Sequence, residues 1–426
     1  MDGVARGTLI NLLTRLLGVG LMLAITAITA RIGTDAQGRF ALFTSVEGVL
    51  LALFSGFGIA LARRVSHHGE DPRALVAATL VVCVGLGFAT GLGLALAAVH
   101  GPDAYAALMF LAVAAPLMLI APNLNGLWLG QGRMVPMALL ALAPPALTLL
   151  FLAIGRVGGG PLSLVQVLVA WMLARTAVAL GALGVVLRRG RVRPDFTALR
   201  AELPFVLTIG ATNLVGLLNY RVGLFVVERL LGLSSTGVYS IAIVVAELLW
   251  FVSGSLTQAV YGRIGTPDRA QAVSTTLRVV HLGVAALLPV APLLWLAAWL
   301  AVPRVLGPAY AASLPLLALL LPGVLLFGGA SALSAYFTNH AGQPRVPAQV
   351  ALSSLLLNGV LALALVPRLG MAGAALAASL SYSFSVALLA WRFARHAGLP
   401  LARVLVPGAQ LLADLRGVAF RRGGHR

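Results

Sequence analysis

Charged and amide side chains occur inside long apolar segments of this chain, where burying them is expensive. An ionised residue at the centre of a membrane-spanning helix costs about 2.5–3.5 kcal/mol on insertion scales, so such residues usually face a polar cavity and mark function. An arginine guanidinium binds phosphate through two hydrogen bonds and stays charged at any working pH. Intramembrane arginines therefore favour an anionic ligand such as a pyrophosphate. The residues concerned are Asn11, Arg15, Glu47, Arg175, Asn213, Asn219, Arg221, Glu228 and Glu247.

Helical spacing groups several of these side chains. Asn11 and Arg15 are four residues apart and share one face of a helix. Asn213, Arg221 and Glu228 are separated by eight and seven residues, which places them on one stripe, with Asn219 beside it. The alternative for each arginine is an ion pair that only holds helices together. That alternative weighs most for Arg175, which has no counterpart in the internal repeat described below. We predict a substrate site formed by Asn11, Arg15, Arg175, Asn213, Asn219 and Arg221.

Three carboxylates complete the predicted site. Glu47 and Glu247 follow the glycines Gly38 and Gly237 by nine and ten residues, so they occupy nearly equivalent places in two halves of the chain. We predict that they bind a coupling proton or Na⁺, or that they hold the arginines in place when the site is empty. Glu228 is a further candidate for this role, with snorkelling to a membrane face as the alternative.

The composition indicates the elements that position these residues. The chain has 426 residues, of which 60% are hydrophobic and only 10% are charged, and its mean hydropathy is +0.99. A soluble domain typically carries about 25% charged residues, whereas a membrane-spanning helix needs about 20 apolar ones. The apolar runs are continuous rather than alternating, which disfavours strands. We predict an all-α membrane protein with about twelve spans at 8–30, 40–62, 74–98, 105–128, 135–155, 163–187, 204–231, 237–262, 276–300, 313–338, 347–367 and 371–392.

The basic residues predict the orientation. The net charge is +18, from 30 basic and 12 acidic residues, and the sequence contains no lysine. Arginines are concentrated in alternate loops, above all between 188 and 200, and in the tail. Because cytoplasmic loops carry the excess of basic residues, we expect both termini in the cytoplasm, near anionic lipids. Basic residues spread over many loops also argue against nucleic-acid binding.

An internal repeat predicts two lobes. Gly33 and Gly38 have the same spacing as Gly232 and Gly237. Further along, Gly101-Pro102, Pro116, Arg133 and Arg156 are matched in order by Gly307-Pro308, Pro322, Arg345 and Arg368. Two six-helix bundles that start on the same side form a parallel repeat around a central cavity, with alternating access by rocking. We predict lobes at 1–195 and 196–392. The remaining segment, 393–426, is a cytoplasmic tail whose residues Leu411, Leu412, Leu415 and Val418 are spaced for an interfacial amphipathic helix.

Catalytic chemistry is disfavoured. Without lysine there is no ordinary phosphate-binding loop for ATP hydrolysis. The single Cys83 excludes an intrachain disulfide and a multi-cysteine metal site. His67 and His68 lack the helical spacing of a zinc site and are better interpreted as part of a solvated loop. We therefore predict no enzyme activity, no catalytic residues, no metal ligands and no cofactor.

Several short motifs resemble the polysaccharide (O-antigen type) flippase family of the multidrug/oligosaccharidyl-lipid/polysaccharide exporter superfamily. They run in the family's order over nearly the whole chain, up to about Arg395. The resemblance implies a cationic central cavity, coupling to an ion gradient, and export of oligosaccharides linked to undecaprenyl pyrophosphate across a bacterial cytoplasmic (inner) membrane. It also implies polysaccharide-assembly proteins as partners. The related peptidoglycan-precursor flippases usually have fourteen helices, which disfavours lipid II as the substrate. The motifs are Asn11 with Arg15, Ala30-Arg31-Ile32-Gly33 leading to Gly38-Arg39-Phe40, Gly237-Val238-Tyr239-Ser240, Gly307-Pro308-Ala309-Tyr310 and Gly370-Met371-Ala372-Gly373.

Two other functions stay open. A cation-coupled multidrug exporter of the same superfamily would favour acidic and aromatic residues in its cavity, and the arginines argue against it. A non-catalytic scaffold in surface-polysaccharide biosynthesis would have no need of Arg15 and Arg221 for glycan export.

Overall fold

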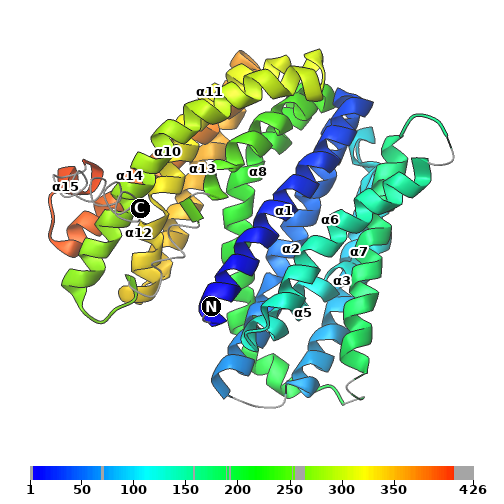
Figure 1. Cartoon of the computed structure of the whole chain (residues 1–426), viewed down its shortest axis with the longest axis horizontal. Helices are drawn as coiled ribbons and strands as arrows, with labels where there is room; N and C mark the ends of the chain where they lie inside the picture. The colour runs from blue at the N-terminus through cyan, green and yellow to red at the C-terminus, as the bar shows by residue number, and fades with distance from the viewer. Residues whose placement is uncertain are drawn as a thin grey trace, which may run out of the picture. The chain divides into compact units, whose positions relative to one another are not determined.

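The chain is helical throughout the part that the structure describes, and that part contains no strand (Figure 1). The computed structural model describes residues 3–68, 72–156, 159–188, 190, 193–251, 253–254 and 264–406, without the side chains of 3–12 and 67–68. Eleven of the described helical runs are long and apolar enough to cross a membrane. The longest, Phe196–Phe251, has 56 residues and bends at Gly232, where φ is 82° and ψ is −178°. It therefore holds the span predicted at 204–231 and residues 237–251 of the span predicted at 237–262, and the predicted all-α membrane fold is confirmed.

Two compact units divide the chain, Met1–Leu217 and Leu218–Arg426, and the boundary falls inside helix α8. The lobes predicted from the repeat stay a prediction, and the predicted apolar face of the tail lies outside the described residues. The helices that begin in the first unit are α1 Gly3–Ile32, α2 Thr34–His68, α3 Arg73–His100, η1 Asp103–Tyr105, α4 Leu108–Met118, α5 Ile120–Gly130, α6 Met134–Arg156, α7 Leu164–Leu187 and α8 Phe196–Glu247. The second unit continues with α10 Arg269–Val305, η2 Pro308–Ala312, α11 Ser313–Gly329, α12 Ser331–Ala335, the π-helix η3 Tyr336–His340, α13 Arg345–Leu369, α14 Met371–Ala397 and α15 Leu401–Leu405.

Local backbone structure matches between the two copies of the repeat. Gly33 joins α1 to α2 with φ at 151°, and Gly232 bends α8 at the equivalent place with φ at 82°. Both conformations favour glycine because it lacks a Cβ. Each Gly-Pro pair stands at the start of a short 3₁₀ helix: Pro102 directly precedes η1, and Pro308 is the first residue of η2. The following helices α4 and α11 each contain a proline, Pro116 or Pro322.

Small residues allow the helices of the first unit to pack closely. Helix α5 lies against α2 so tightly that a Cβ added to Gly126 would lie 1.8 Å from the carbonyl oxygen of Gly58. Asn123 closes the same contact, because its Oδ1 accepts a hydrogen bond from the Gly58 backbone N–H at 2.8 Å. In lipid the helices gain no hydrophobic free energy by associating, so close van der Waals packing between small residues holds them together.

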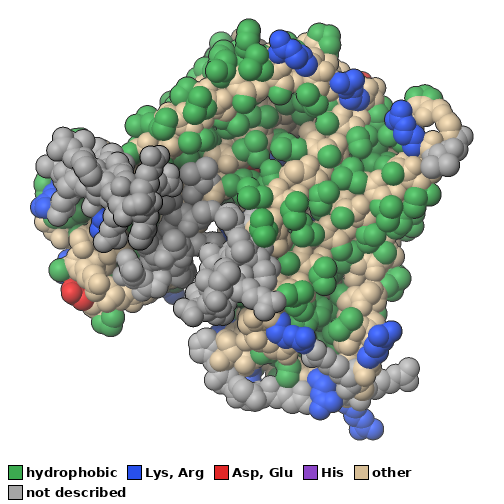
Figure 2. All heavy atoms as spheres, viewed as in Figure 1, with side chains coloured by type: hydrophobic (Ala, Val, Ile, Leu, Met, Phe, Trp, Pro, Cys, Tyr) green, Lys and Arg blue, Asp and Glu red, His purple; other side chains and the backbone are tan. Residues whose placement is uncertain are grey.

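Large apolar side chains cover the outer surfaces of the helices, as Figure 2 shows, and basic side chains appear near the helix ends. Leu92 is 64% exposed and Val113 is 66% exposed. This pattern suits hydrocarbon around the middle of each helix and charged headgroups at its ends. The chain is a multi-pass membrane protein.

Candidate functional site

The first unit contains a buried ion pair between Glu47 of α2 and Arg175 of α7. The Arg175 Nε lies 2.9 Å from Glu47 Oε1, and Arg175 Nη2 donates a hydrogen bond to Glu47 Oε2 at 3.2 Å. The Trp171 Nε1–H donates to the same Oε2 at 3.1 Å. Glu47 is only 3% exposed. Its carboxylate is therefore surrounded by donors from a single neighbouring helix.

Helical periodicity positions all four residues of this contact. Trp171 and Arg175 are four residues apart on α7, so they share a face, and the guanidinium lies 4.9 Å from the centre of the indole ring. Phe40 and Glu47 are seven residues apart on α2 and also share a face. The Phe40 ring meets the Trp171 ring edge-on at 5.4 Å. An aromatic contact and an ionic contact therefore lie one above the other between the two helices.

Arg175 lies at the depth of the bilayer centre. It is the twelfth residue of the 24-residue helix α7, so about 16 Å of helix separates it from either end at 1.5 Å per residue. That distance is about half of the roughly 30 Å hydrocarbon core. A charge at this depth is expensive, and its carboxylate partner offsets part of the cost.

The second unit contains a two-pronged ion pair between Arg221 and Glu247, which are both on α8 on opposite sides of the Gly232 bend. Arg221 Nη1 donates to Glu247 Oε1 at 2.9 Å, and Nη2 donates to Oε2 at 3.2 Å. The side chains of Arg221 and Glu247 are 21% and 24% exposed. Parallel bonds of this kind are the geometry in which a guanidinium also recognises a phosphate.

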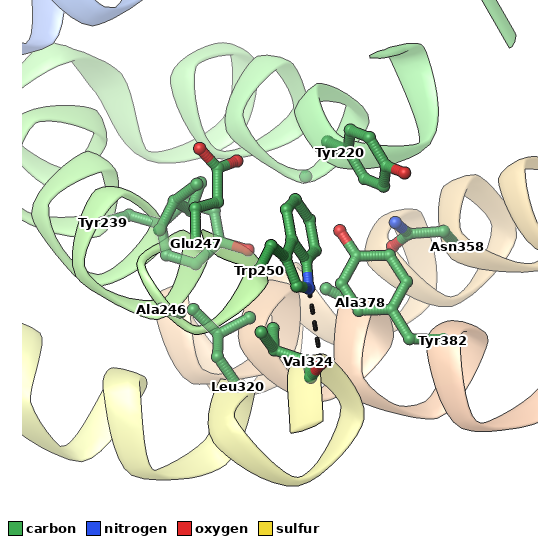
Figure 3. Close-up of a pocket in the computed structure, with 12 residues that line it drawn as sticks. Tyr220, Tyr239, Ala246, Glu247, Trp250, Leu320, Val324, Asn358, Ala378 and Tyr382 are labelled. Carbon is green, nitrogen blue, oxygen red and sulfur yellow. Dashed lines mark hydrogen bonds between the residues drawn. The ribbon is translucent and has the colours of Figure 1, made fainter. Parts of the chain in front are cut away.

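Four aromatic rings gather beside this second pair: Tyr220 of α8, Trp250 just beyond its end, Phe327 of α11 and Tyr382 of α14. Their centroids lie 4.7–6.3 Å apart. In Figure 3, Tyr220, Trp250 and Tyr382 point toward one another, and the Trp250 Nε1–H donates to the Val324 carbonyl at 3.3 Å. Tyr220, Trp250 and Tyr382 line a small cavity together with Glu247, and this cavity has room for about one water molecule.

A buried amide network continues from the aromatic rings. Asn219 donates to Ser354 Oγ at 3.0 Å, and Asn358 donates to the Asn219 carbonyl at 2.8 Å. The Tyr382 hydroxyl approaches the same carbonyl at 3.4 Å. Asn219 and Asn358 are 2% and 1% exposed. Helices α8, α13 and α14 are thus tied together by side-chain polar groups at the level of the Arg221 pair.

The structure also describes other members of the predicted site. Asn213 is exposed, belongs to the first unit and donates to Ser55 Oγ of α2 at 2.7 Å. Arg15 is half-buried on α1, and the Asn11 side chain lies outside the described side chains. Glu228 is on α8 and is 7% exposed. The structure therefore brings together Glu47 with Arg175 and Arg221 with Glu247 from the predicted set.

Sequence reasoning missed the residues that surround these pairs. Trp171 could have been found, because it precedes Arg175 by one helical turn. Tyr382 and Asn358 carry no comparable signal, because they come from helices far along the chain and meet Asn219 only in the folded protein. No group of three or more metal-binding side chains occurs among the residues that the structure describes.

Each pair can exchange its partner. A guanidinium held by a carboxylate becomes available when the carboxylate takes a proton or when a stronger anion displaces it. In a low-dielectric interior both changes alter the local free energy more than they would in water. Such a pair can therefore link the arrival of an anion to the protonation of a glutamate.

Comparison with known proteins identifies the fold. No protein-family model matches the chain, and no curated protein matches it. Among solved structures, it is similar to an inward-facing multidrug resistance MATE family transporter of the MOP superfamily, with a TM-score of 0.76, 15% identity, and coverage of 91% of this chain and 96% of the other. The lipid II flippase MurJ in an inward closed conformation gives a TM-score of 0.70 at 14% identity, covering 94% and 89%. A MOP superfamily transporter from Pyrococcus furiosus gives 0.62 at 14%, covering 93% and 96%.

These similarities extend over nearly the whole of each chain. Identities of 14–15% establish the fold alone. The chain therefore shares its all-helical fold with these solved transporter structures. Its structural neighbours include multidrug transporters and a lipid flippase, which are membrane transporters rather than enzymes.

Proposed function

We propose that this chain moves an oligosaccharide linked to a polyprenyl pyrophosphate from the cytoplasmic to the periplasmic leaflet of a bacterial inner membrane by alternating access. The observation that carries the proposal is the pair of intramembrane arginines, Arg175 and Arg221, each held by one glutamate. A purely apolar contact would join the helices without desolvating two charges. Retaining a guanidinium at this depth is useful when an anionic group must pass.

The glutamates supply a means of coupling in this proposal. Protonation of Glu247 would remove the negative partner of Arg221 and leave the guanidinium ready for a pyrophosphate. Glu47 would act in the same way on Arg175, and Glu228 is a third candidate for the coupling proton or cation. The related fold of a lipid II flippase supports a lipid-linked substrate, and the transporter from Pyrococcus furiosus, described as having a binding pocket of reverse polarity, supports a change of substrate class within this fold.

Replacing Arg221 tests the proposal. In cells that lack the chromosomal copy of this gene, Arg221→Gln should abolish the surface glycan, because the neutral amide cannot bind a pyrophosphate as an ion. Arg221→Lys should export weakly, because an ammonium keeps the charge but loses the two-pronged geometry. Arg156→Gln, at an exposed helix end, is the matched control and should export normally. The amount of each variant in the membrane fraction is measured in parallel.

Normal glycan in Arg221→Gln cells, with the protein present in the membrane, would contradict this function and favour the scaffold alternative. The glycan is measured by gel electrophoresis of the surface polysaccharide. Cytoplasmic accumulation of the lipid-linked oligosaccharide in the same cells separates a block in export from a block in synthesis.

A multidrug exporter is the second candidate function, and the four-ring cluster favours it. Tyr220, Trp250 and Tyr382 line the same small cavity as Glu247, and Phe327 packs against these three rings. Aromatic faces with a carboxylate attract organic cations. For this function, overexpression should raise resistance to cationic dyes, and Trp250→Ala should remove that resistance while Arg221→Gln leaves it. Unchanged dye resistance on overexpression would reject this candidate.

A further inference from the structure

An apolar groove runs between helices α10 and α11 of the second unit. It has a volume of about 550 Å³ and opens on the outer surface, where Leu288 is 58% exposed and Leu326 is 37% exposed. Both helices are candidate membrane spans, so the groove opens toward hydrocarbon. The residues that line it are all apolar: Leu288, Ala291, Pro292, Trp295, Ala318, Leu321, Pro322, Leu325 and Leu326.

Two prolines and two alanines account for the groove. Proline has no N–H, so Pro292 cannot bond the carbonyl of Leu288, and Pro322 cannot bond that of Ala318, which loosens each helix where it lines the groove. Ala291 and Ala318 are too small to fill the space. The Trp295 Nε1–H donates to the Leu314 carbonyl at 3.2 Å, so the polar atom of the indole has a partner and its ring forms an apolar wall.

The groove lies at the middle of the bilayer. Arg278 and Arg304 on α10 are both exposed and are 26 residues, or about 39 Å, apart, which matches the roughly 40–45 Å between headgroup regions. The groove residues of α10 begin about 15 Å from Arg278 and end about 14 Å from Arg304. Helix α11 agrees, because Ala318 lies ten residues, about 15 Å, after Pro308 at the start of its span.

We propose that this groove holds the polyisoprenoid tail of the lipid that carries the substrate, an inference that rests on the proposed function. An ordinary acyl chain ends near the midplane, so only its terminus reaches the groove from either leaflet. A polyprenyl chain longer than half the bilayer extends through it. Since the groove is equidistant from both membrane faces, the tail can stay seated while the headgroup changes leaflet.

Filling the groove tests the proposal. The full chain is placed in nanodiscs of phosphatidylethanolamine and phosphatidylglycerol, and bound undecaprenyl phosphate is measured by native mass spectrometry. Ala318→Trp fills the groove and should lower retention about tenfold. Ala297→Trp, on an exposed face of α10 outside the groove, should retain as much as the wild type. Farnesyl phosphate, whose chain is too short to reach the midplane, should not displace the bound undecaprenyl phosphate.

If the Ala318→Trp variant fails to insert into the membrane, a crosslinking measurement tests whether the groove binds the polyisoprenoid tail. Benzoylphenylalanine at position 326, on the rim of the groove, should crosslink undecaprenyl phosphate in preference to the phospholipids on illumination. Crosslinks to phospholipid alone, or equal retention by Ala318→Trp and the wild type, would overturn the proposal.

The two proposals fail in different ways. If Ala318→Trp retains undecaprenyl phosphate while Arg221→Gln loses surface glycan, the groove assignment is wrong and the export function stands. If Ala318→Trp loses the lipid while Arg221→Gln exports normally, the groove binds polyprenyl chains but the proposed translocation is wrong.

Discussion

Substituting Glu47 by Gln removes the only charge that the structure shows bonded to the Arg175 guanidinium among the described residues. The carboxylate is 3% exposed and has three donor atoms within 2.9–3.2 Å, two from Arg175 and one from Trp171. Breaking a buried pair by removing one partner costs about 3–5 kcal/mol, because the other charge stays buried without compensation. The Arg175 side chain is 25% exposed, so we expect the lower end of this range, about 3 kcal/mol, for the loss in the free energy of unfolding.

A double-mutant cycle isolates the pair. Glu47→Gln and Arg175→Gln should each destabilise the protein, and the double variant should lose about 2 kcal/mol less than their sum, because it leaves no unpaired charge. The free energies come from unfolding titrations in mixed micelles, followed by tryptophan fluorescence.

An exposed pair in the same unit is the matched control. Arg39 of α2 bonds Asp103 of η1, whose side chain is 87% exposed, and such surface pairs are worth about 0.2–1 kcal/mol. A coupling free energy for Glu47 and Arg175 no larger than that of this control would refute the argument that burial makes the inner pair strong.

Two further substitutions test the packing around this site. Gly126→Ala places a methyl group against the backbone of α2 and should lower the free energy of unfolding by about 1–3 kcal/mol. Its control is Gly85→Ala, where no atom lies within 4 Å of the added carbon, and this variant should have an unchanged or higher free energy of unfolding. Equal free energies of unfolding for the two variants would contradict this prediction. Trp171→Phe keeps an aromatic ring but removes the hydrogen-bond donor to Glu47, and it should lower the free energy of unfolding by about 1–3 kcal/mol in the same titration. A loss below about 0.5 kcal/mol would show that this hydrogen bond contributes little to stability.

The sequence predicted the spans well because hydropathy is a local property. Runs of apolar residues long enough to cross hydrocarbon became helices, since the backbone must satisfy its own hydrogen bonds there. The spans predicted at 204–231 and 237–262 lie on either side of Gly232, where the structure bends α8 with a positive φ. Pro292 and Pro322 are also visible in the sequence, but the groove that they line could not be predicted from it, because the groove forms only where two helices lie side by side.

The partners of the charged residues were harder to predict. The repeat paired Glu47 with Glu247 and set Arg175 apart as a residue without a counterpart. In the structure, Glu47 bonds Arg175 across 128 positions of the chain, whereas Glu247 bonds Arg221 across 26. The carboxylates are equivalent by repeat, yet their arginines come from different helices.

By itself the sequence determined that this chain is a multi-pass membrane protein and which residues of its apolar segments carry charge, because both follow from transfer free energies summed along short segments. The tertiary structure decided which arginine pairs with which glutamate, which aromatic rings share a cavity with Glu247, and where two helices leave an apolar groove. Those outcomes depend on distances of a few ångströms between residues far apart in the chain, and electrostatic and packing energies change steeply over such distances.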